Sequence, residues 1–209
     1  MDDLKNLKCL LPKTESLLLK MIDNCHFLDK YVLVGGSALA LYLCHRKSED
    51  LDFFTYDDSF DRAEIFEYIK QFDSKEILNQ TDEQIDLLLD GVKVTFFNAK
   101  WKFLEPETVK RFNLSSLEAI ASMKVNVMFL RAKYRDYYDL YFLVKSGMSL
   151  REVFACSQDI VEGITFKLFI IALVYIDDIE DDNIGYLEPK EIISKEKIRD
   201  FFQEKIDRF

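Results

Sequence analysis

Gly35-Gly36-Ser37 and, eleven residues after the serine, Ser48-Glu49-Asp50-Leu51-Asp52 are the residues that decide how this chain folds. A short apolar run before the glycines predicts a buried strand, the glycine turn opens a helix, and a second strand begins beside the aspartates. Backbone N–H groups at a helix N-terminus favour phosphate. Residues i and i+2 of a strand point to one side, so the two aspartates face the same way. Two such carboxylates repel unless a cation lies between them, and Mg²⁺ takes oxygen ligands and bridges to phosphate. The stretch therefore predicts a site for a nucleoside triphosphate (NTP), with Asp50 and Asp52 as catalytic metal ligands.

Each of these residues also has a plainer interpretation. Gly35 and Gly36 could form an ordinary tight turn, and Asp50 and Asp52 could lie on a solvated strand face. Ser37 can accept hydrogen bonds from backbone N–H groups as a helix cap, or it can contact phosphate. Arg46, at the end of the first helix, can compensate the helix dipole or bind phosphate. We favour nucleotide binding because the glycine turn, the helix and the acidic pair follow one another directly.

The composition indicates a folded protein that is not built for a membrane. Hydrophobic residues make up 49% of the 209 residues and charged residues 32%, which predicts a packed core. No apolar run reaches the ~20 residues of a membrane helix. The acidic N-terminus lacks the positive flank of a signal peptide, so we expect a cytoplasmic protein. The four cysteines show no metal-binding spacing, and we expect reduced thiols.

The charge is unevenly distributed along the chain. Residues 93–135 contain nine basic and three acidic residues, a charge of +6, whereas the net charge of the whole chain is −10. A basic stretch in an acidic protein suggests a local site for a polyanion, either a triphosphate or RNA. From charge alone, a solvated helix face explains the stretch equally well.

The periodicity predicts two parts. A mixed α/β part with an N-terminal helix spans residues 1–103, and a helical part spans 104–209 and packs on the core, because no flexible linker separates them. Asp90-Gly91 between two β-rich runs predicts a hairpin, and Asp61 is a candidate helix cap. The predicted strands are 31–34, 51–55, 85–89 and 92–97, and the predicted helices are 14–30, 38–44, 61–72, 117–131, 137–144, at least one within 150–175, and 192–209.

Three ionisable residues of the helical part are candidates for the site. Lys124 falls on or beside the apolar stripe of its helix, so it should snorkel outward, meet a charge or contact phosphate. Asp136 and Asp139, spaced i and i+3, share a helix face close to aromatic residues. Either could accept the proton of an attacking hydroxyl. Arg131 and Arg135 could pair with these aspartates or line an RNA path.

The sequence resembles one family, the AbiEii/AbiGii-type nucleotidyltransferases of the DNA polymerase β-like superfamily, which includes toxins of type IV toxin–antitoxin and abortive-infection systems. The resemblance covers residues 31–144 and rests on Gly-Gly-Ser-Ala-Leu at 35–39, on residues 45–54, and on Arg-Ala-Lys-Tyr-Arg-Asp-Tyr-Tyr-Asp-Leu-Tyr at 131–141. It implies a polymerase β-like α/β (α+β) nucleotidyltransferase core with a mixed sheet and a C-terminal helical part.

The resemblance also implies roles for individual residues. Gly35, Gly36 and Ser37 match the turn that holds the triphosphate, and Asp50 and Asp52 match the metal-binding pair. Ser48 stands where the family has Ser or Thr before the first aspartate. Lys124 matches a lysine thought to contact the nucleotide, and Asp136 and Asp139 match late carboxylates.

One position departs from the wider superfamily. Those enzymes usually carry a third carboxylate on a later strand, and here the expected position holds Thr95. Either two aspartates suffice, or Asp136, Asp139 or Asp86 supplies the third carboxylate, or catalysis is weakened.

We therefore predict a Mg²⁺-dependent nucleotidyltransferase that moves a nucleotide from an NTP to an acceptor hydroxyl. The favoured acceptor, from the resemblance and the basic stretch, is a tRNA 3′ end, and a cognate antitoxin protein is the expected partner. The alternatives are nucleotidylation of a protein or a small molecule, and a non-catalytic module that binds a nucleotide or a partner.

Overall fold

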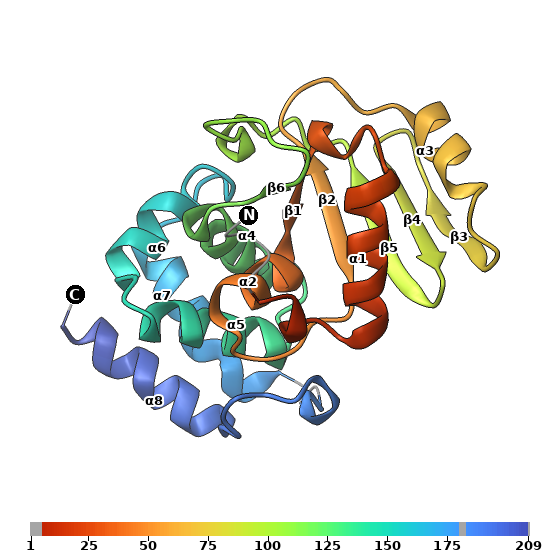
Figure 1. The fold of residues 1–209 in the computed structure, drawn as a ribbon. Helices are drawn as coiled ribbons and strands as arrows, with labels where there is room; N and C mark the ends of the chain where they lie inside the picture. Colours follow the sequence, from red (N-terminus) through yellow and green to blue (C-terminus); the bar gives the residue numbers. More distant parts are fainter. Residues whose placement is uncertain (1–5, 180–182, 209) are drawn as a thin grey trace. The chain divides into compact units, whose positions relative to one another are not determined.

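The structure, a computed structural model, describes residues 6–179 and 183–208. The chain forms two compact units, the first ending at Ser116 and the second beginning at Leu117 (Figure 1). The sequence predicts this boundary after residue 103. The first unit extends further because residues 113–114 form a strand that pairs with β1 and closes one edge of the sheet. The packing of the helical part on the core stays a prediction.

The described residues of the first unit form a six-stranded mixed sheet in the order β3-β4-β5-β2-β1-β6. The strands are β1 (Tyr31–Val34), β2 (Leu51–Thr55), β3 (Lys75–Gln80), β4 (Gln84–Leu89), β5 (Val92–Phe97) and β6 (Asn113–Leu114). β2 runs parallel to β5 and antiparallel to β1. The predicted hairpin is confirmed, since Asp90 and Gly91 have φ angles of 50° and 83°, as a tight turn between β4 and β5 requires.

The sheet has an apolar face and a polar face. On the three central strands, Leu51 and Phe53, Ile85 and Leu87, and Val94 and Phe96 are at most 1% exposed. The N-terminal helix α1 packs against β5 (Figure 1). Side chains alternate along a strand, so the residues between these apolar ones leave the sheet on the other face. That face carries Asp52, Thr95 and Asp86.

The helices of the first unit differ slightly from the prediction. They are α1 (Pro12–Asn24), α2 (Gly35–Leu43) and α3 (Arg62–Ile69), with short 3₁₀ helices η2 (Leu7–Cys9), η3 (Leu28–Lys30) and η4 (Lys102–Leu104). The prediction for α1 ran to residue 30, but Cys25 is extended and ends the helix. Asp61 caps α3 as expected, because its carboxylate accepts hydrogen bonds from the backbone N–H groups of Ala63 and Glu64 at 2.8 and 3.2 Å.

The second unit is helical. Its helices are α4 (Leu117–Leu130), α5 (Tyr134–Lys145), α6 (Leu150–Ser157), α7 (Phe166–Val174) and α8 (Lys195–Ile206), with 3₁₀ helices η5 (Tyr175–Asp178) and η6 (Gly185–Leu187). Helix α5 begins three residues earlier than predicted. In residues 6–179 and 183–208, no helix combines the length and the apolar character needed to cross a bilayer.

Candidate nucleotide site

The diglycine turn brings the start of α2 against the first strand carboxylate. Helix α2 begins at Gly35 directly after β1, and Gly35 has a φ of +71°, which L side chains rarely adopt. A Cβ built at this position would lie 3.0 Å from Asp52 Oδ2. Glycine is therefore required here both for the backbone conformation and for the close approach of the carboxylate.

The second glycine faces a buried arginine and a buried serine. A Cβ at Gly36 would lie 2.7 Å from Arg46 Nη2 and 3.3 Å from Ser48 Oγ. Arg46 and Ser48 are 4% and 5% exposed, and Arg46 Nη1 also donates to the carbonyl of Lys47 at 2.9 Å. The structure therefore brings a guanidinium and a hydroxyl to the helix N-terminus, where an anion is favoured.

Ser37 does not cap the helix, contrary to one of our two interpretations. The N-cap position is Val34, and it makes no side-chain cap bond. The Ser37 hydroxyl instead donates to the backbone carbonyl of Asp50. This hydrogen bond ties the start of α2 to the chain that enters β2. A phosphate contact of Ser37 stays a prediction.

Asp50 directly precedes β2, and Asp52 is the second residue of that strand. Both side chains are half-buried, and Asp52 is paired across the sheet with Val34 of β1 and Thr95 of β5. Oxygen ligands beside a helix N-terminus fit a divalent cation that bridges to phosphate. Within the described parts of the chain, no three His, Cys, Asp or Glu side chains form a metal-binding group, so the candidate site rests on this pair.

The residue that replaces the superfamily's third carboxylate is joined to an acid on the next strand. Thr95 is paired with Asp52 on one side and with Asp86 of β4 on the other. Its hydroxyl donates to Asp86 Oδ1 at 2.8 Å, and both residues are buried. Of the acids considered for the third position, Asp86 is the one that shares this row of the sheet.

Lys124, Asp136 and Asp139 form a buried cluster within the second unit. Lys124 Nζ lies 3.0 Å from Asp136 Oδ1 and 2.5 Å from Asp139 Oδ2. The side chains are 8%, 0% and 0% exposed. Of the three fates considered for Lys124, the structure shows the pairing with charge. An ammonium has three protons, so two contacts leave one for a further acceptor such as phosphate.

Arg131 belongs to the edge of the same cluster. Its Nη2 lies 3.7 Å from Asp136 Oδ1, and its side chain is 48% exposed. Of the two roles considered for Arg131, the structure shows pairing with an aspartate. The i, i+3 spacing of the two aspartates puts them on one face of α5, which is why one lysine of α4 reaches both.

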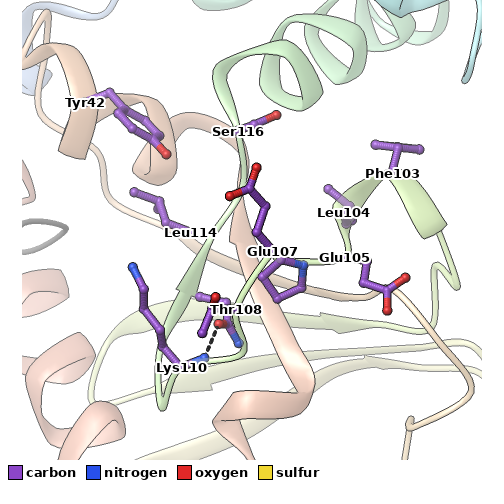
Figure 2. Close-up of a pocket in the computed structure, with 11 residues that line it drawn as sticks. Tyr42, Phe103, Leu104, Glu105, Glu107, Thr108, Lys110, Leu114 and Ser116 are labelled. Carbon is purple, nitrogen blue, oxygen red and sulfur yellow. Dashed lines mark hydrogen bonds between the residues drawn. The ribbon is translucent and has the colours of Figure 1, made fainter.

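A separate pocket of about 410 Å³ opens in the first unit. Its walls come from Tyr42 of α2, the segment 103–110 and β6 (Figure 2). The Tyr42 hydroxyl donates to the carbonyl of Ser115 at 3.0 Å. None of the predicted site residues lines this pocket, so the pocket is not part of the candidate nucleotide site.

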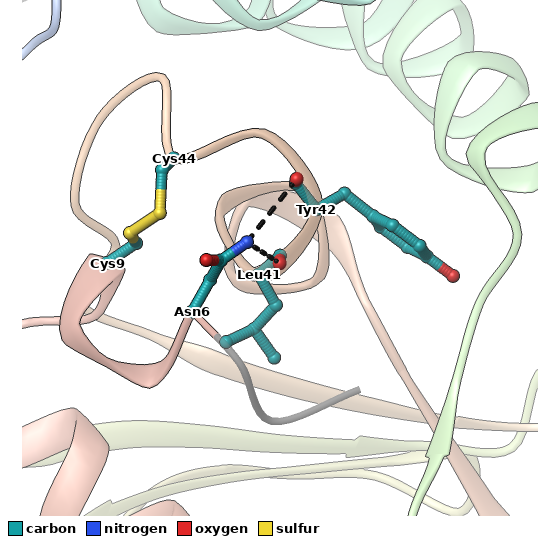
Figure 3. Close-up of a disulfide and its surroundings, with 5 residues drawn as sticks. All are labelled: Asn6, Cys9, Leu41, Tyr42 and Cys44. Carbon is teal, nitrogen blue, oxygen red and sulfur yellow. Dashed lines mark hydrogen bonds between the residues drawn. A yellow bond between two sulfur atoms is a disulfide. The ribbon is translucent and has the colours of Figure 1, made fainter. Parts of the chain in front are cut away.

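The expectation of four reduced thiols is wrong for two of the cysteines. Cys9 and Cys44 form a disulfide with a Cα–Cα distance of 5.3 Å (Figure 3). Cys44 ends α2 in a left-handed conformation, and Asn6 donates to the carbonyl of Leu41 at 2.8 Å, which places η2 beside this helix end. Thirty-five residues separate the two cysteines, so their spacing carried no signal. The other two are free, and burial raises the pKa of the Cys25 thiol to about 12.

The N-terminal segment also holds the loop that carries Arg46 and Ser48. The backbone N–H of Leu11 donates to the carbonyl of Ser48 at 2.9 Å, and that of Ser48 donates to the carbonyl of Cys9 at 3.2 Å. The Thr14 hydroxyl donates to the carbonyl of Glu49 at 2.8 Å. Sequence reasoning missed these positioning residues because the loop contributes only backbone groups to the contacts.

Comparisons with known proteins bear on the family and the fold of the chain. Residues 16–110 match the model of the AbiEii family, described as "Nucleotidyl transferase AbiEii toxin, Type IV TA system". A protein of Aquifex aeolicus (strain VF5), described as uncharacterized, is 29% identical over 204 residues, which cover 95% of this chain and 97% of that protein.

Two solved structures share the fold. The structure of JHP933 from Helicobacter pylori superposes with a TM-score of 0.56 at 20% identity and covers 95% of this chain and 94% of that one. The nucleotidyltransferase toxin MenT4 from Mycobacterium tuberculosis H37Rv gives a TM-score of 0.58 at 16% identity and covers 98% and 88%. The predicted fold class, an α/β nucleotidyltransferase core with a helical part, is confirmed. Through residues 16–110 the chain matches the nucleotidyl transferase toxins of the AbiEii family, and the resemblance predicted from the sequence is confirmed.

Proposed function

We propose that this protein is a Mg²⁺-dependent nucleotidyltransferase that moves a nucleotide from an NTP to an acceptor hydroxyl and releases pyrophosphate. One observation carries the proposal. The Asp52 carboxylate lies against Gly35, while the Arg46 guanidinium and the Ser48 hydroxyl lie against Gly36. Groups for a cation and groups for a phosphate therefore meet at one helix N-terminus, which is the arrangement that a triphosphate with its metal requires.

The residues of the turn would act mainly by positioning. The backbone N–H groups at the start of α2, with Arg46 and Ser48, would bind phosphate oxygens and orient the α-phosphorus for in-line attack. Asp50 and Asp52 would hold the Mg²⁺, which when bound neutralises charge on the phosphates. A bond then forms between the acceptor oxygen and the α-phosphorus, and the bond to pyrophosphate breaks.

The remaining predicted residues, Lys124, Asp136 and Asp139, form the buried cluster of the second unit. We assign Lys124 to the nucleotide, through its third proton, and Asp136 or Asp139 to the proton of the attacking hydroxyl. Burying three charged side chains is costly and contributes little stability compared with apolar residues. The cluster therefore has no evident value for stability alone, and its burial is consistent with a catalytic role.

A tRNA 3′ end is our preferred acceptor, and a cognate antitoxin protein is the expected partner. We expect the protein in the cytoplasm, where NTP and tRNA both occur. The net charge of +6 over residues 93–135 supports a polyanionic acceptor. At least four of its nine basic residues have acidic partners among the described residues, which weakens this support: Lys100 with Asp58, Lys102 with Glu105, Lys124 with Asp136 and Asp139, and Arg131 with Asp136.

The test is transfer of label from each NTP to total tRNA, to cell protein or to small molecules such as aminoglycosides. Asp50→Asn should abolish transfer to whichever acceptor is used. Asp90→Asn is the matched control, since Asp90 is an exposed acid of the hairpin turn that pairs with Lys20, and it should keep full activity. An Asp50→Asn protein with full activity would show that the metal assignment is wrong.

The presence of Thr95 instead of a third carboxylate favours a second candidate function, binding without catalysis. With two strand carboxylates instead of three, the protein could bind a nucleotide or a partner without turnover. Calorimetry would then show NTP binding, while long incubations with every acceptor class would release no pyrophosphate.

A further inference from the structure

The hydrogen bond of Thr95 has a direction that its chemistry dictates. A threonine hydroxyl has one proton to donate and two lone pairs. The partner at 2.8 Å is the carboxylate oxygen Oδ1 of Asp86, and an ionised carboxylate can only accept. The proton of Thr95 is therefore committed to Asp86, and toward any other neighbour the Thr95 oxygen can act only as an acceptor or as a ligand.

Asp86 is surrounded by donors. Gln84 Nε2 lies 3.0 Å from Oδ1 and 2.9 Å from Oδ2, and Asn79 Nδ2 lies 3.3 Å from Oδ2. Together with Thr95, these groups satisfy a carboxylate that is 7% exposed and hold it in one orientation. A fixed, buried acceptor is what a hydroxyl needs to keep a single rotamer.

The strand register then determines which residue lies on the other side of Thr95. Asp52↔Thr95 and Thr95↔Asp86 are cross-strand partners, so the three side chains leave the same face of neighbouring strands. Neighbouring strands of a sheet lie about 4.8 Å apart. Thr95 and Asp52, whose carboxylate lies against Gly35, therefore occupy neighbouring positions on one face of the sheet.

We propose that Thr95 Oγ1 is a further oxygen ligand of the divalent cation, and that Asp86 is a positioning residue that holds the Thr95 proton away from it. This inference rests on the proposed function, because it needs the cation at Asp50 and Asp52. Threonine and serine hydroxyls bind Mg²⁺ in this way beside an aspartate in P-loop NTPases. Thr95 would thus supply an oxygen ligand at the position where a third carboxylate is expected. The negative charge would instead be on Asp86, one strand further away in β4.

Binding of Mn²⁺ without any NTP tests the inference independently of turnover. The free ion is measured by electron paramagnetic resonance during titration of the purified full chain. Thr95→Val removes the hydroxyl and keeps the shape, and it should weaken Mn²⁺ binding by at least about tenfold, the effect typical of altering a metal's supporting groups. Thr95→Ser should stay within about threefold of the original protein. Should the valine variant not fold, Thr95→Ala removes the same oxygen.

A double-mutant cycle separates positioning from a general effect on folding. Asp86→Asn should weaken Mn²⁺ binding by about tenfold, but it should have no further effect in a Thr95→Val background, because Asp86 acts through Thr95. Asp90→Asn, on the same hairpin, should leave binding unchanged. Additive losses would mean that Asp86 acts separately from Thr95 and would overturn its assignment.

Mn²⁺ binding by Asp52→Asn shows whether a negative result concerns Thr95 alone or the proposed metal site itself. If Asp52→Asn loses Mn²⁺ while Thr95→Val keeps the affinity of the original protein, the further inference is wrong and the proposed site stands. If Asp52→Asn and the original protein bind Mn²⁺ equally, the proposed site itself is wrong.

Discussion

Replacing Lys124 by methionine should strongly destabilise the helical unit, whatever its effect on catalysis. The Lys124 ammonium contacts Asp136 at 3.0 Å and Asp139 at 2.5 Å, and both carboxylates are 0% exposed. Methionine keeps most of the apolar stem but removes the charge between them. Removing one partner of a buried ion pair costs about 3–5 kcal/mol, because the remaining charge is left in a medium that solvates it poorly.

A loss of that size is easily measured. Domains are stable by roughly 5–15 kcal/mol, so Lys124→Met should shift the urea unfolding midpoint far outside experimental error. Lys145→Met is the matched control in the same unit. Lys145 pairs with Glu191 at 2.6 Å, but these side chains are 41% and 40% exposed, and surface pairs contribute about 0–1 kcal/mol.

A triple variant tests whether the unpaired aspartate charges cause the loss of stability. Combining Lys124→Met with Asp136→Asn and Asp139→Asn removes all three charges and should recover part of the lost stability, because no uncompensated charge is then left in the interior. A loss below about 1 kcal/mol for Lys124→Met, matching the Lys145→Met control, would show that the aspartates are hydrated or open to a ligand site.

Three further outcomes follow from the first unit. Gly35→Ala and Gly91→Ala should each lower the free energy of unfolding by about 1–2 kcal/mol, because both glycines have positive φ angles. Only Gly35→Ala should also abolish NTP binding measured by calorimetry. Equal NTP affinities of the two variants would show that the glycine turn is not part of the site. Reduction of the Cys9–Cys44 disulfide, which closes a loop of 35 residues, should lower the free energy of unfolding by roughly 3–4 kcal/mol in urea titrations, and an unchanged midpoint would argue against the bond. Burial raises the pKa of Cys25 to about 12, and its side chain is buried. The thiol should therefore be protonated and inaccessible at pH 8, and alkylation of the native protein should leave it unlabelled by mass spectrometry.

Local sequence signals predicted most of the elements that hold the candidate site. The buried strand β1, the glycine turn, the acidic strand β2 and the Asp90-Gly91 hairpin are all present. Strands β3 and β6 were missed for different physical reasons. All six residues of β3 are exposed, so they show no alternation, and β6 has only two residues, so it exists only through its pairing with β1.

Contacts between distant residues were predicted less well. The sequence offered three fates for Lys124 and three acids for the position of Thr95, and it suggested reduced cysteines. Each depended on which side chains the fold brings within a few ångströms of one another. The Cys9–Cys44 bond and the Thr95–Asp86 hydrogen bond are two such contacts.

The order of residues alone determined the strand–turn–helix–strand unit, because backbone preferences and the alternation of side chains act over a few neighbours. It also predicted that Asp50 and Asp52 share one side of this segment, and the structure places Asp52 against Gly35. Only the tertiary structure decided which partner each buried charge or hydroxyl received. That choice depends on strand register and helix packing, which bring together groups that are far apart along the chain, and the cost of leaving a buried polar group unpaired then selects the arrangement.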